Sequence, residues 1–212
     1  MTELARSIIR NAAGLGLFAL VTAGVIAMTH AVTAERIAYN RQANEYRALK
    51  QVVPDALHDN DLLDATVLLP AAPDLGHAAP FTAWRAMRRG QVSAVILPVT
   101  APDGYSSAIE LLVGIDSYGR LSGVRVVHHQ ETPGLGDGIE VRKSDWITRF
   151  TGLSLDHPPP SQWAVKKDGG RFDAFTGATV TPRAVVGAVR RSLEYFAVNR
   201  QRLLNASEDD HQ

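Results

Sequence analysis

The sequence contains no cysteine in its 212 residues. This absence excludes disulfide bonds, thiolate nucleophiles and any zinc or iron–sulfur centre held by cysteine. Any redox chemistry must therefore come from another cofactor. The absence does not locate the protein, because a domain without disulfides can live on either side of a bacterial membrane.

An excess of charge is also missing, since 22 Lys and Arg residues balance 22 Asp and Glu residues. A bulk electrostatic attraction to nucleic acid has no support, and no nucleic-acid partner is expected. The composition, 45% hydrophobic and 21% charged, suits one membrane anchor plus one ordinary folded domain. It excludes a multi-span transporter.

Common nucleotide-binding and catalytic motifs are absent as well. The chain has no G-x-x-x-x-G-K-[ST], no H-E-x-x-H and no G-x-S-x-G. Glycines alternate over residues 134–138, but without the spacing of a dinucleotide fingerprint. His128 and His129 precede Glu131, yet adjacent residues of a strand point to opposite faces, so no shared metal ion is expected.

One apolar segment is present near the N-terminus. Ala12–Met28 carries no charge and continues through tolerant residues, so 12–34 form a helix long enough for the ~30 Å hydrocarbon core. A cleaved signal peptide is the alternative, because Arg6 and Arg10 precede the run and residues 32–34 offer a cleavage site. The run exceeds a usual signal core, and its all-round apolar surface disfavours a buried helix. We expect an uncleaved anchor.

The remaining boundaries follow from helix formers and prolines. Residues 35–53 predict a helical stalk that Pro54 ends, residues 54–204 form the folded domain, and residues 205–212 form a disordered tail. Basic residues flank the anchor on both sides, so charge does not settle its orientation.

The folded domain is expected to be α+β with a mainly antiparallel sheet flanked by helices. Apolar, β-branched runs predict strands at 92–99, 108–115 and 121–127, joined as a meander. Prolines make residues 55–90 read as loops and small elements. Within that stretch the basic cluster Arg85, Arg88 and Arg89 is interpreted as a solvated face.

Two helices are expected after the strands. Residues 146–153 predict a short one, whose Trp146 and Phe150 are interpreted as core residues. A better one opens with Thr181 as N-cap and Pro182 as its first residue. The apolar residues that it presents on one face to the sheet are Val185, Val186, Val189, Leu193 and Phe196.

Two loops stand out from the rest of the chain. In His129–Gly136, a proline and two glycines follow a strand and expose backbone amides, which suits either a stiff turn or close approach of a planar ligand. In Asp173–Pro182, Gly177 permits close backbone approach. Thr179 offers a hydroxyl just before a helix N-terminus, where a phosphate is favoured. An ordinary capped loop is the alternative.

The run D-x-x-T-G-A-T, residues 173–179, resembles the acceptor of bacterial flavin transferases, which join FMN through its phosphate to the last threonine. Together with the E-T-P-G-L-G loop at 131–136, the Gly104-Tyr105 turn and the strand at 112–116, it resembles the G-subunit family of the Rnf (Rsx) ion-translocating electron-transport complexes. The resemblance covers nearly the whole chain.

The resemblance implies a covalently flavinylated electron carrier in a complex that couples electron flow between NADH and ferredoxin to ion translocation. It implies a single-pass protein of the bacterial inner membrane, with residues 1–11 in the cytoplasm and the folded domain in the periplasm. The implied partners are the other Rnf subunits, the bilayer and a separate flavin transferase, because no His or Lys is predicted close enough to activate Thr179. No catalytic residue and no metal are expected in the chain itself.

FMN is then expected on Thr179 through its phosphate. The other residues expected to shape the acceptor loop or lie against the flavin are Asp173, Thr176, Gly177, Ala178, Val180, Glu131, Thr132, Pro133, Gly134, Leu135 and Gly136. Glu131 either orients its loop or contacts the ligand. Two alternatives stay open. One is the C subunit of the sodium-translocating NADH–quinone reductase, and the other is a membrane-anchored scaffold whose acceptor loop remains unmodified.

Overall fold

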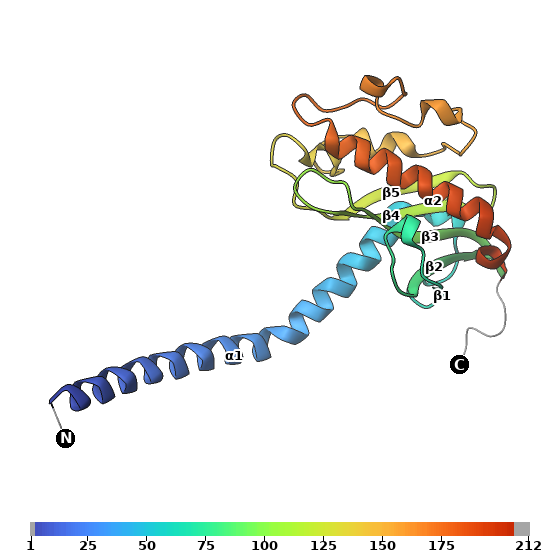
Figure 1. The fold of residues 1–212 in the computed structure, drawn as a ribbon. Helices are drawn as coiled ribbons and strands as arrows, with labels where there is room; N and C mark the ends of the chain where they lie inside the picture. The colour runs from blue at the N-terminus through green and yellow to red at the C-terminus, as the bar shows by residue number, and fades with distance from the viewer. Residues whose placement is uncertain (1–2, 206–212) are drawn as a thin grey trace. The chain divides into compact units, whose positions relative to one another are not determined.

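The structure, a computed structural model, describes the backbone of residues 3–205 and the side chains of 7–30, 32–34 and 46–205. The chain divides into two compact units, Met1–Glu45 and Tyr46–Gln212 (Figure 1). Residues 206–212, which make up most of the expected tail, lie outside the described residues. Each unit is considered by itself below.

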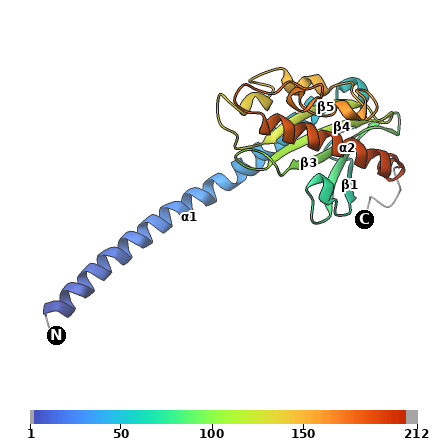
Figure 2. The same ribbon diagram turned by 45° about the horizontal axis from the view of Figure 1, so that its top comes forward.

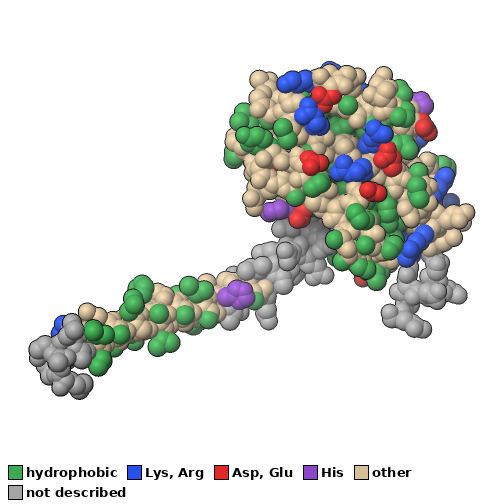
Figure 3. Space-filling view, viewed as in Figure 1, with side chains coloured by type: hydrophobic (Ala, Val, Ile, Leu, Met, Phe, Trp, Pro, Cys, Tyr) green, Lys and Arg blue, Asp and Glu red, His purple; other side chains and the backbone are tan. Residues whose placement is uncertain are grey.

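The first unit consists of most of helix α1, which spans Glu3–Val52. Its segment Ser7–Ala34 is long and apolar enough to cross a membrane, and apolar side chains cover its surface without protein packed on them (Figure 3). Leu20 and Met28, for example, are 74% and 72% exposed. The Thr22 and Thr29 hydroxyls donate to carbonyl oxygens one turn earlier, at 2.9 and 2.7 Å. These hydroxyls are thus satisfied within the helix, as a lipid environment requires.

The second unit is built on a five-stranded antiparallel sheet in the order β1-β2-β3-β4-β5. The strands are β1 (Thr66–Leu69), β2 (Phe81–Arg88), β3 (Gln91–Ala101), β4 (Ile109–Asp116) and β5 (Leu121–His128). The last three confirm the predicted meander, and the predicted α+β fold with an N-terminal apolar helix is confirmed.

The prediction that residues 55–90 hold only loops and small elements is wrong, because β1 and β2 lie there. The prolines bound these strands instead of interrupting them: Pro70 follows β1, and Pro80 precedes β2. Alternating burial along β1 places Val67 and Leu69 in the core. β1 has only four residues, and the pairing of β2 shifts register between Ala86 and Met87, so neither strand shows a long apolar–polar alternation that would stand out beside the prolines.

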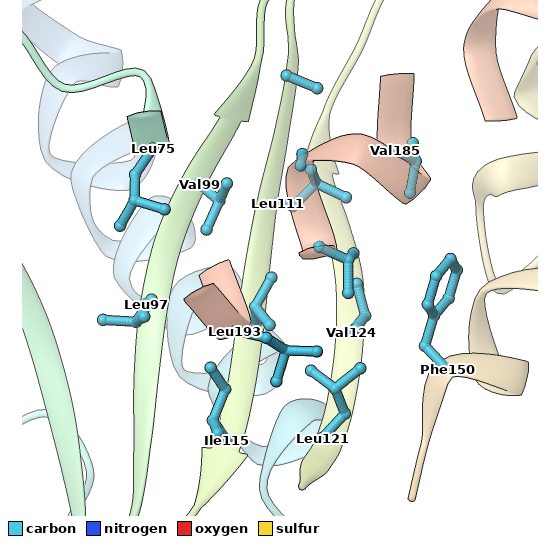
Figure 4. Packing of buried hydrophobic residues seen from close by; sticks show 14 of the residues in the cluster. Leu75, Leu97, Val99, Leu111, Ile115, Leu121, Val124, Phe150, Val185 and Leu193 are labelled. Atoms are coloured by element: carbon cyan, nitrogen blue, oxygen red, sulfur yellow. The ribbon is translucent and has the colours of Figure 1, made fainter. Parts of the chain in front are cut away.

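Helix α2 (Val180–Leu204) crosses one face of the sheet (Figure 2). Its five predicted core residues are all buried, as the periodicity indicates. Figure 4 shows Val185 and Leu193 among the sheet residues Leu97, Val99 and Leu111. The predicted helix at 146–153 is a 3-10 helix over Trp146–Phe150, whose two aromatic rings are buried in this core, as interpreted.

The last turn of α1 packs on the opposite face. Leu49 and Val52 contact Ala94 and Ile96, which alternate along β3 with the residues that face α2. The backbone can approach because Gly114 and Gly123 pair across β4 and β5, and a Cβ at Gly123 would lie 2.6 Å from the Val52 carbonyl oxygen. The Ser122 hydroxyl donates to the same oxygen at 2.9 Å.

The interpretation of Arg85 as part of a solvated face is wrong. Arg85 is 5% exposed, whereas Arg88 and Arg89 are exposed at the end of the strand. Its guanidinium donates to the carbonyl oxygens of Arg202, Leu203 and Asn205 at 3.1, 3.1 and 2.9 Å. Arg202 and Leu203 belong to the last turn of α2 and Asn205 follows it; carbonyls at a helix end lack partners within the helix, so a buried cation is stabilised there.

Candidate functional site

The two loops singled out in the sequence meet at one pocket of about 370 Å³. This volume lies in the range of small-molecule sites, which is roughly 300–1,000 Å³. The pocket is lined by Tyr105, Glu131, Thr132, Leu135, Gly136, Gly177, Ala178, Thr179, Val180 and Thr181. Eight of these ten residues belong to the set expected from the sequence, and they come from segments far apart in the chain.

Thr179 is the residue that precedes α2. It is half-buried, its side chain makes no capping hydrogen bond, and its hydroxyl has no partner within the part of the chain that the structure describes. The Arg183 amide donates to its carbonyl oxygen at 3.2 Å, which begins the helix. The free amides and the positive end of the helix dipole at this position favour an anion.

Gly177 brings the acceptor loop close to the other loop. Its φ of +80° lies in the left-handed region, where side chains are rarely accommodated. A Cβ at this position would lie 3.5 Å from Cδ2 of Leu135, so the glycine leaves the space between the two loops open. Leu135 and Val180 are 47% and 39% exposed, which gives the pocket mouth an apolar rim.

Glu131 is a buried carboxylate at the base of the pocket, with 4% of its surface exposed. The Ser106 amide donates to its Oε1 at 3.0 Å, and the Thr181 hydroxyl donates to its Oε2. Burial alone would raise the pKa of Glu131, but hydrogen bonds from Thr181 and from the amides of Ser106, Tyr105 and Ser107 hold that pKa below its usual value. Glu131 is therefore ionised at neutral pH.

The prediction that Thr181 caps α2 is wrong. The helix begins at Val180, and the Thr181 side chain is fully buried and bonded to Glu131. Pro182 is then the third residue of the helix, where its missing amide costs no intrahelical hydrogen bond. The side-chain partner fifty residues away could not be seen in the local sequence.

Four residues of the expected site do not line the pocket. Thr176, Pro133 and Gly134 are exposed beside it. Asp173 is absent from the lining, and its carboxylate pairs with Lys166 at 2.6 Å and Arg149 at 2.9 Å. The Lys166 hydrogen bond is the main reason that the pKa of Asp173 lies below its usual value.

Tyr105 and Thr181 line the pocket without having been assigned to it from the sequence. Tyr105 stands in the loop between β3 and β4, and its only sequence signal is the Gly104-Tyr105 turn. His129 and Glu140 pair at 3.0 Å, but no group of three potential metal ligands occurs among the described residues.

Comparison with known proteins defines the class first. A family model described as an FMN-binding domain matches residues 104–194, which include every residue that lines the pocket. A second model, described as the RnfG N-terminal region, matches residues 1–52, which hold the apolar segment of α1. The chain is an FMN-binding domain behind an N-terminal apolar helix.

Full-length relatives then identify the family. The G subunit of the ion-translocating oxidoreductase complex of Pseudomonas aeruginosa is 55% identical, over 96% of this chain and 95% of the relative. The G subunit from Shewanella loihica is 48% identical over 94% of each chain. The chain belongs to this G-subunit family, so the resemblance seen in the sequence is confirmed. The solved structure of NqrC from Shewanella oneidensis matches at 24% identity, with a TM-score of 0.49, over 70% of this chain and 72% of that chain.

Proposed function

We propose that the chain is the membrane-anchored electron-transfer subunit of an Rnf-type complex, with FMN joined through its phosphate to Thr179. The observation that carries this proposal is the unbonded Thr179 hydroxyl at the mouth of the pocket, at the N-terminus of α2, in a member of the G-subunit family. The complex couples electron flow between NADH and ferredoxin to ion translocation. The partners of this chain are the other Rnf subunits.

The pocket fits FMN in three respects. The start of α2 supplies amides and a dipole for the phosphate. Gly136 has no room for a side chain, since a Cβ there would lie 2.9 Å from Oγ1 of Thr181, and Gly177 leaves the space beside Leu135 unfilled. The exposed apolar surface of Leu135 and Val180 suits the face of a planar ring. FMN supplies the capacity to accept and release electrons, and the chain's residues hold it in place.

Attachment requires a second protein. The Thr179 oxygen forms a bond to the FMN phosphorus and loses its proton, while a leaving group departs from that phosphorus, as AMP would from FAD. No His or Lys lines the pocket, and both Glu131 oxygens already accept hydrogen bonds. A base and a bound flavin donor must therefore come from a flavin transferase that recognises the acceptor loop.

The membrane arrangement is part of the same proposal. Residues 1–11 lie in the cytoplasm, residues 12–34 cross the bacterial inner membrane once, residues 35–53 form the stalk, and residues 54–204 form the FMN-binding domain in the periplasm. A covalent tether there prevents loss of the flavin from an open pocket and keeps it near neighbouring carriers. The apolar surface of Ser7–Ala34 supports the bilayer as a partner.

The test is co-expression of the full chain with a flavin transferase, followed by a denaturing gel viewed under ultraviolet light and by intact-mass measurement. Wild type should give a fluorescent band with the mass of one added FMN moiety. Thr179→Ala should give a dark band, while Thr82→Ala, which removes an exposed hydroxyl from β2, should stay fluorescent. A dark wild-type band beside an active transferase would support an unmodified scaffold instead.

Gly177→Val should block attachment, because a branched side chain strains the loop and crowds Leu135. Gly152→Val is the matched control: its φ is +83°, yet a Cβ there would meet nothing within 4 Å. If the two variants lost flavin equally, as measured by intact mass, backbone strain alone would explain the effect and the close-approach argument would fail.

A further inference from the structure

Resting on the proposed function, we propose that Tyr105 is the aromatic wall of the flavin pocket and that Glu131 is the positioning residue that holds it there. Neither role follows from the acceptor motif, which lies more than forty residues further along the chain from both. The inference joins two observations: an exposed aromatic side chain at the pocket, and a buried carboxylate bonded to the turn that carries it.

Tyr105 contributes little to the core. It is 72% exposed, and it is the one aromatic side chain among the described residues that line the pocket. Exposure alone does not single this ring out, since Tyr118 is 82% exposed; what distinguishes Tyr105 is that its exposed ring borders the pocket. A planar conjugated ligand held between Leu135 and the start of α2 would contact that ring, because aromatic rings stack on one another with offset faces.

The turn that carries Tyr105 is packed directly on the Glu131 carboxylate. Oε1 accepts the Ser106 amide at 3.0 Å, and a Cβ on Gly104 would overlap the Ser107 carbonyl oxygen and lie 3.1 Å from Oε1. The turn thus packs tightly on this carboxylate and leaves no room for a side chain at Gly104. Its shape depends on the negative charge and on the position of this one side chain.

The other carboxylate oxygen fixes the acceptor side. Oε2 accepts the Thr181 hydroxyl, two residues after Thr179. A Cβ on Gly136 would lie 2.9 Å from Oγ1 of Thr181 and 3.0 Å from Oε2, so the loop of Gly136 closes over this bond. Glu131 therefore ties the Tyr105 turn, its own loop and the start of α2 together.

A neutral amide replaces this carboxylate only in part. Glutamine keeps one oxygen for the Ser106 amide, and its NH₂ group can donate to the Thr181 hydroxyl oxygen, so the bond on that side reverses and both contacts lose the charge of the carboxylate. Glu131→Gln should thus loosen the Tyr105 turn. The ring of Tyr105 would then be held less closely over the pocket, while Thr179 itself is unchanged.

The experiment uses the full chain, co-expressed with a flavin transferase and purified in detergent. The intact mass of each preparation gives the fraction of chains that carry flavin. The readouts are fluorescence per bound flavin and the midpoint potential, because a stacked tyrosine ring quenches a flavin. Tyr105→Ala should raise the fluorescence roughly twofold or more, as expected for a stacking preference of roughly two- to tenfold. Tyr105→Phe keeps a stacking ring but removes the phenol that donates the quenching electron, so its fluorescence should rise while its midpoint potential stays close to wild type. Tyr118→Ala, which removes a tyrosine that is 82% exposed outside the pocket, should change neither readout.

Glu131→Gln should raise the fluorescence, as Tyr105→Ala does. Glu194→Gln, which changes a half-buried carboxylate paired with Arg190 on α2 outside the pocket, should not. If Glu131→Gln does not fold, Thr181→Val breaks only one of the two bonds, and Thr181→Ser should restore wild-type fluorescence. A purely structural role would lower the melting temperature and leave fluorescence per flavin unchanged.

The outcomes separate the two proposals. A wild-type chain that takes up no flavin would overturn the proposed function. A flavinylated Tyr105→Ala variant with wild-type fluorescence and potential would overturn the aromatic wall and leave the proposed function standing. If Tyr105→Ala brightens the flavin but Glu131→Gln and Thr181→Val do not, the positioning role of Glu131 is refuted.

Discussion

At the residue scale, the site combines groups that the sequence reveals with groups that it hides. Thr179, Gly177 and Leu135 lie in short motifs, and the resemblance of those motifs to a flavinylated family assigned them to one site before any fold was known. Asp173 belongs to the same motif as Thr179, but its carboxylate pairs with Arg149 and Lys166, which come from other segments. The partnership of Glu131 with Thr181 likewise depends on tertiary structure.

Glu131 predicts a pH dependence. Its folded-state pKa lies below that of the unfolded chain, so its carboxylate stabilises the domain fully above the usual glutamate pKa of about 4.3. That contribution is lost as the pH falls through the lower folded-state value. The melting temperature, followed by tryptophan fluorescence, should fall less in Glu131→Gln than in wild type when the pH is lowered from about 6 to about 3, a range that brackets the usual glutamate pKa. Equal falls in both would contradict the assignment.

At the scale of elements, apolar periodicity predicted α2 and the three strands beneath it, because each buries one clear face. The same reasoning failed for β1 and β2, where prolines at the strand ends resemble loop signals. It also failed for Arg85, since no local pattern shows that a basic residue of β2 meets the far end of α2. Pairing between distant segments, rather than propensity, decides these features.

Arg85→Met should destabilise the domain by about 2–3 kcal/mol, because three carbonyl oxygens at the end of α2 lose a charged donor. Arg88→Met, on the exposed end of the same strand, should change the stability by less than about 0.5 kcal/mol. Urea unfolding of the two variants side by side measures the difference. Similar values for both would show that the buried guanidinium is not what secures the helix end.

The packing of the last turn of α1 on the sheet predicts that two glycine-to-alanine variants change the stability in opposite directions. Gly123→Ala should cost about 1–3 kcal/mol, because the new Cβ would meet the Val52 backbone oxygen at 2.6 Å. Gly187→Ala, inside α2, should add about 0.5–1 kcal/mol of stability, since its nearest contact is the mobile end of Arg191. Urea unfolding in which Gly123→Ala is at least as stable as wild type would rule out the close packing of Val52 on the sheet.

At the scale of the whole molecule, hydropathy predicted the membrane-spanning helix because the segment is apolar on every side. The side of the membrane could not be predicted in the same way, since basic residues flank the anchor at both ends. The folded domain gives no further clue to the side, because acidic and basic side chains are interspersed on the face shown in Figure 3. Orientation therefore needs a direct experiment.

The missing cysteines make that experiment clean, because any single introduced thiol is the only one in the chain. Val198→Cys places a thiol at a side chain that is 86% exposed on α2. A membrane-impermeant maleimide added to intact spheroplasts should label this variant. It should label Thr2→Cys only after lysis. The reverse pattern would place the folded domain in the cytoplasm.

The central claim is that Thr179 carries FMN in the working complex. The most direct test is mass spectrometry of the peptide that contains Thr179, taken from the complex purified from its native membrane. We predict that this peptide carries one FMN phosphoryl group on the Thr179 oxygen. A consistently unmodified peptide from a preparation that still transfers electrons would contradict the account.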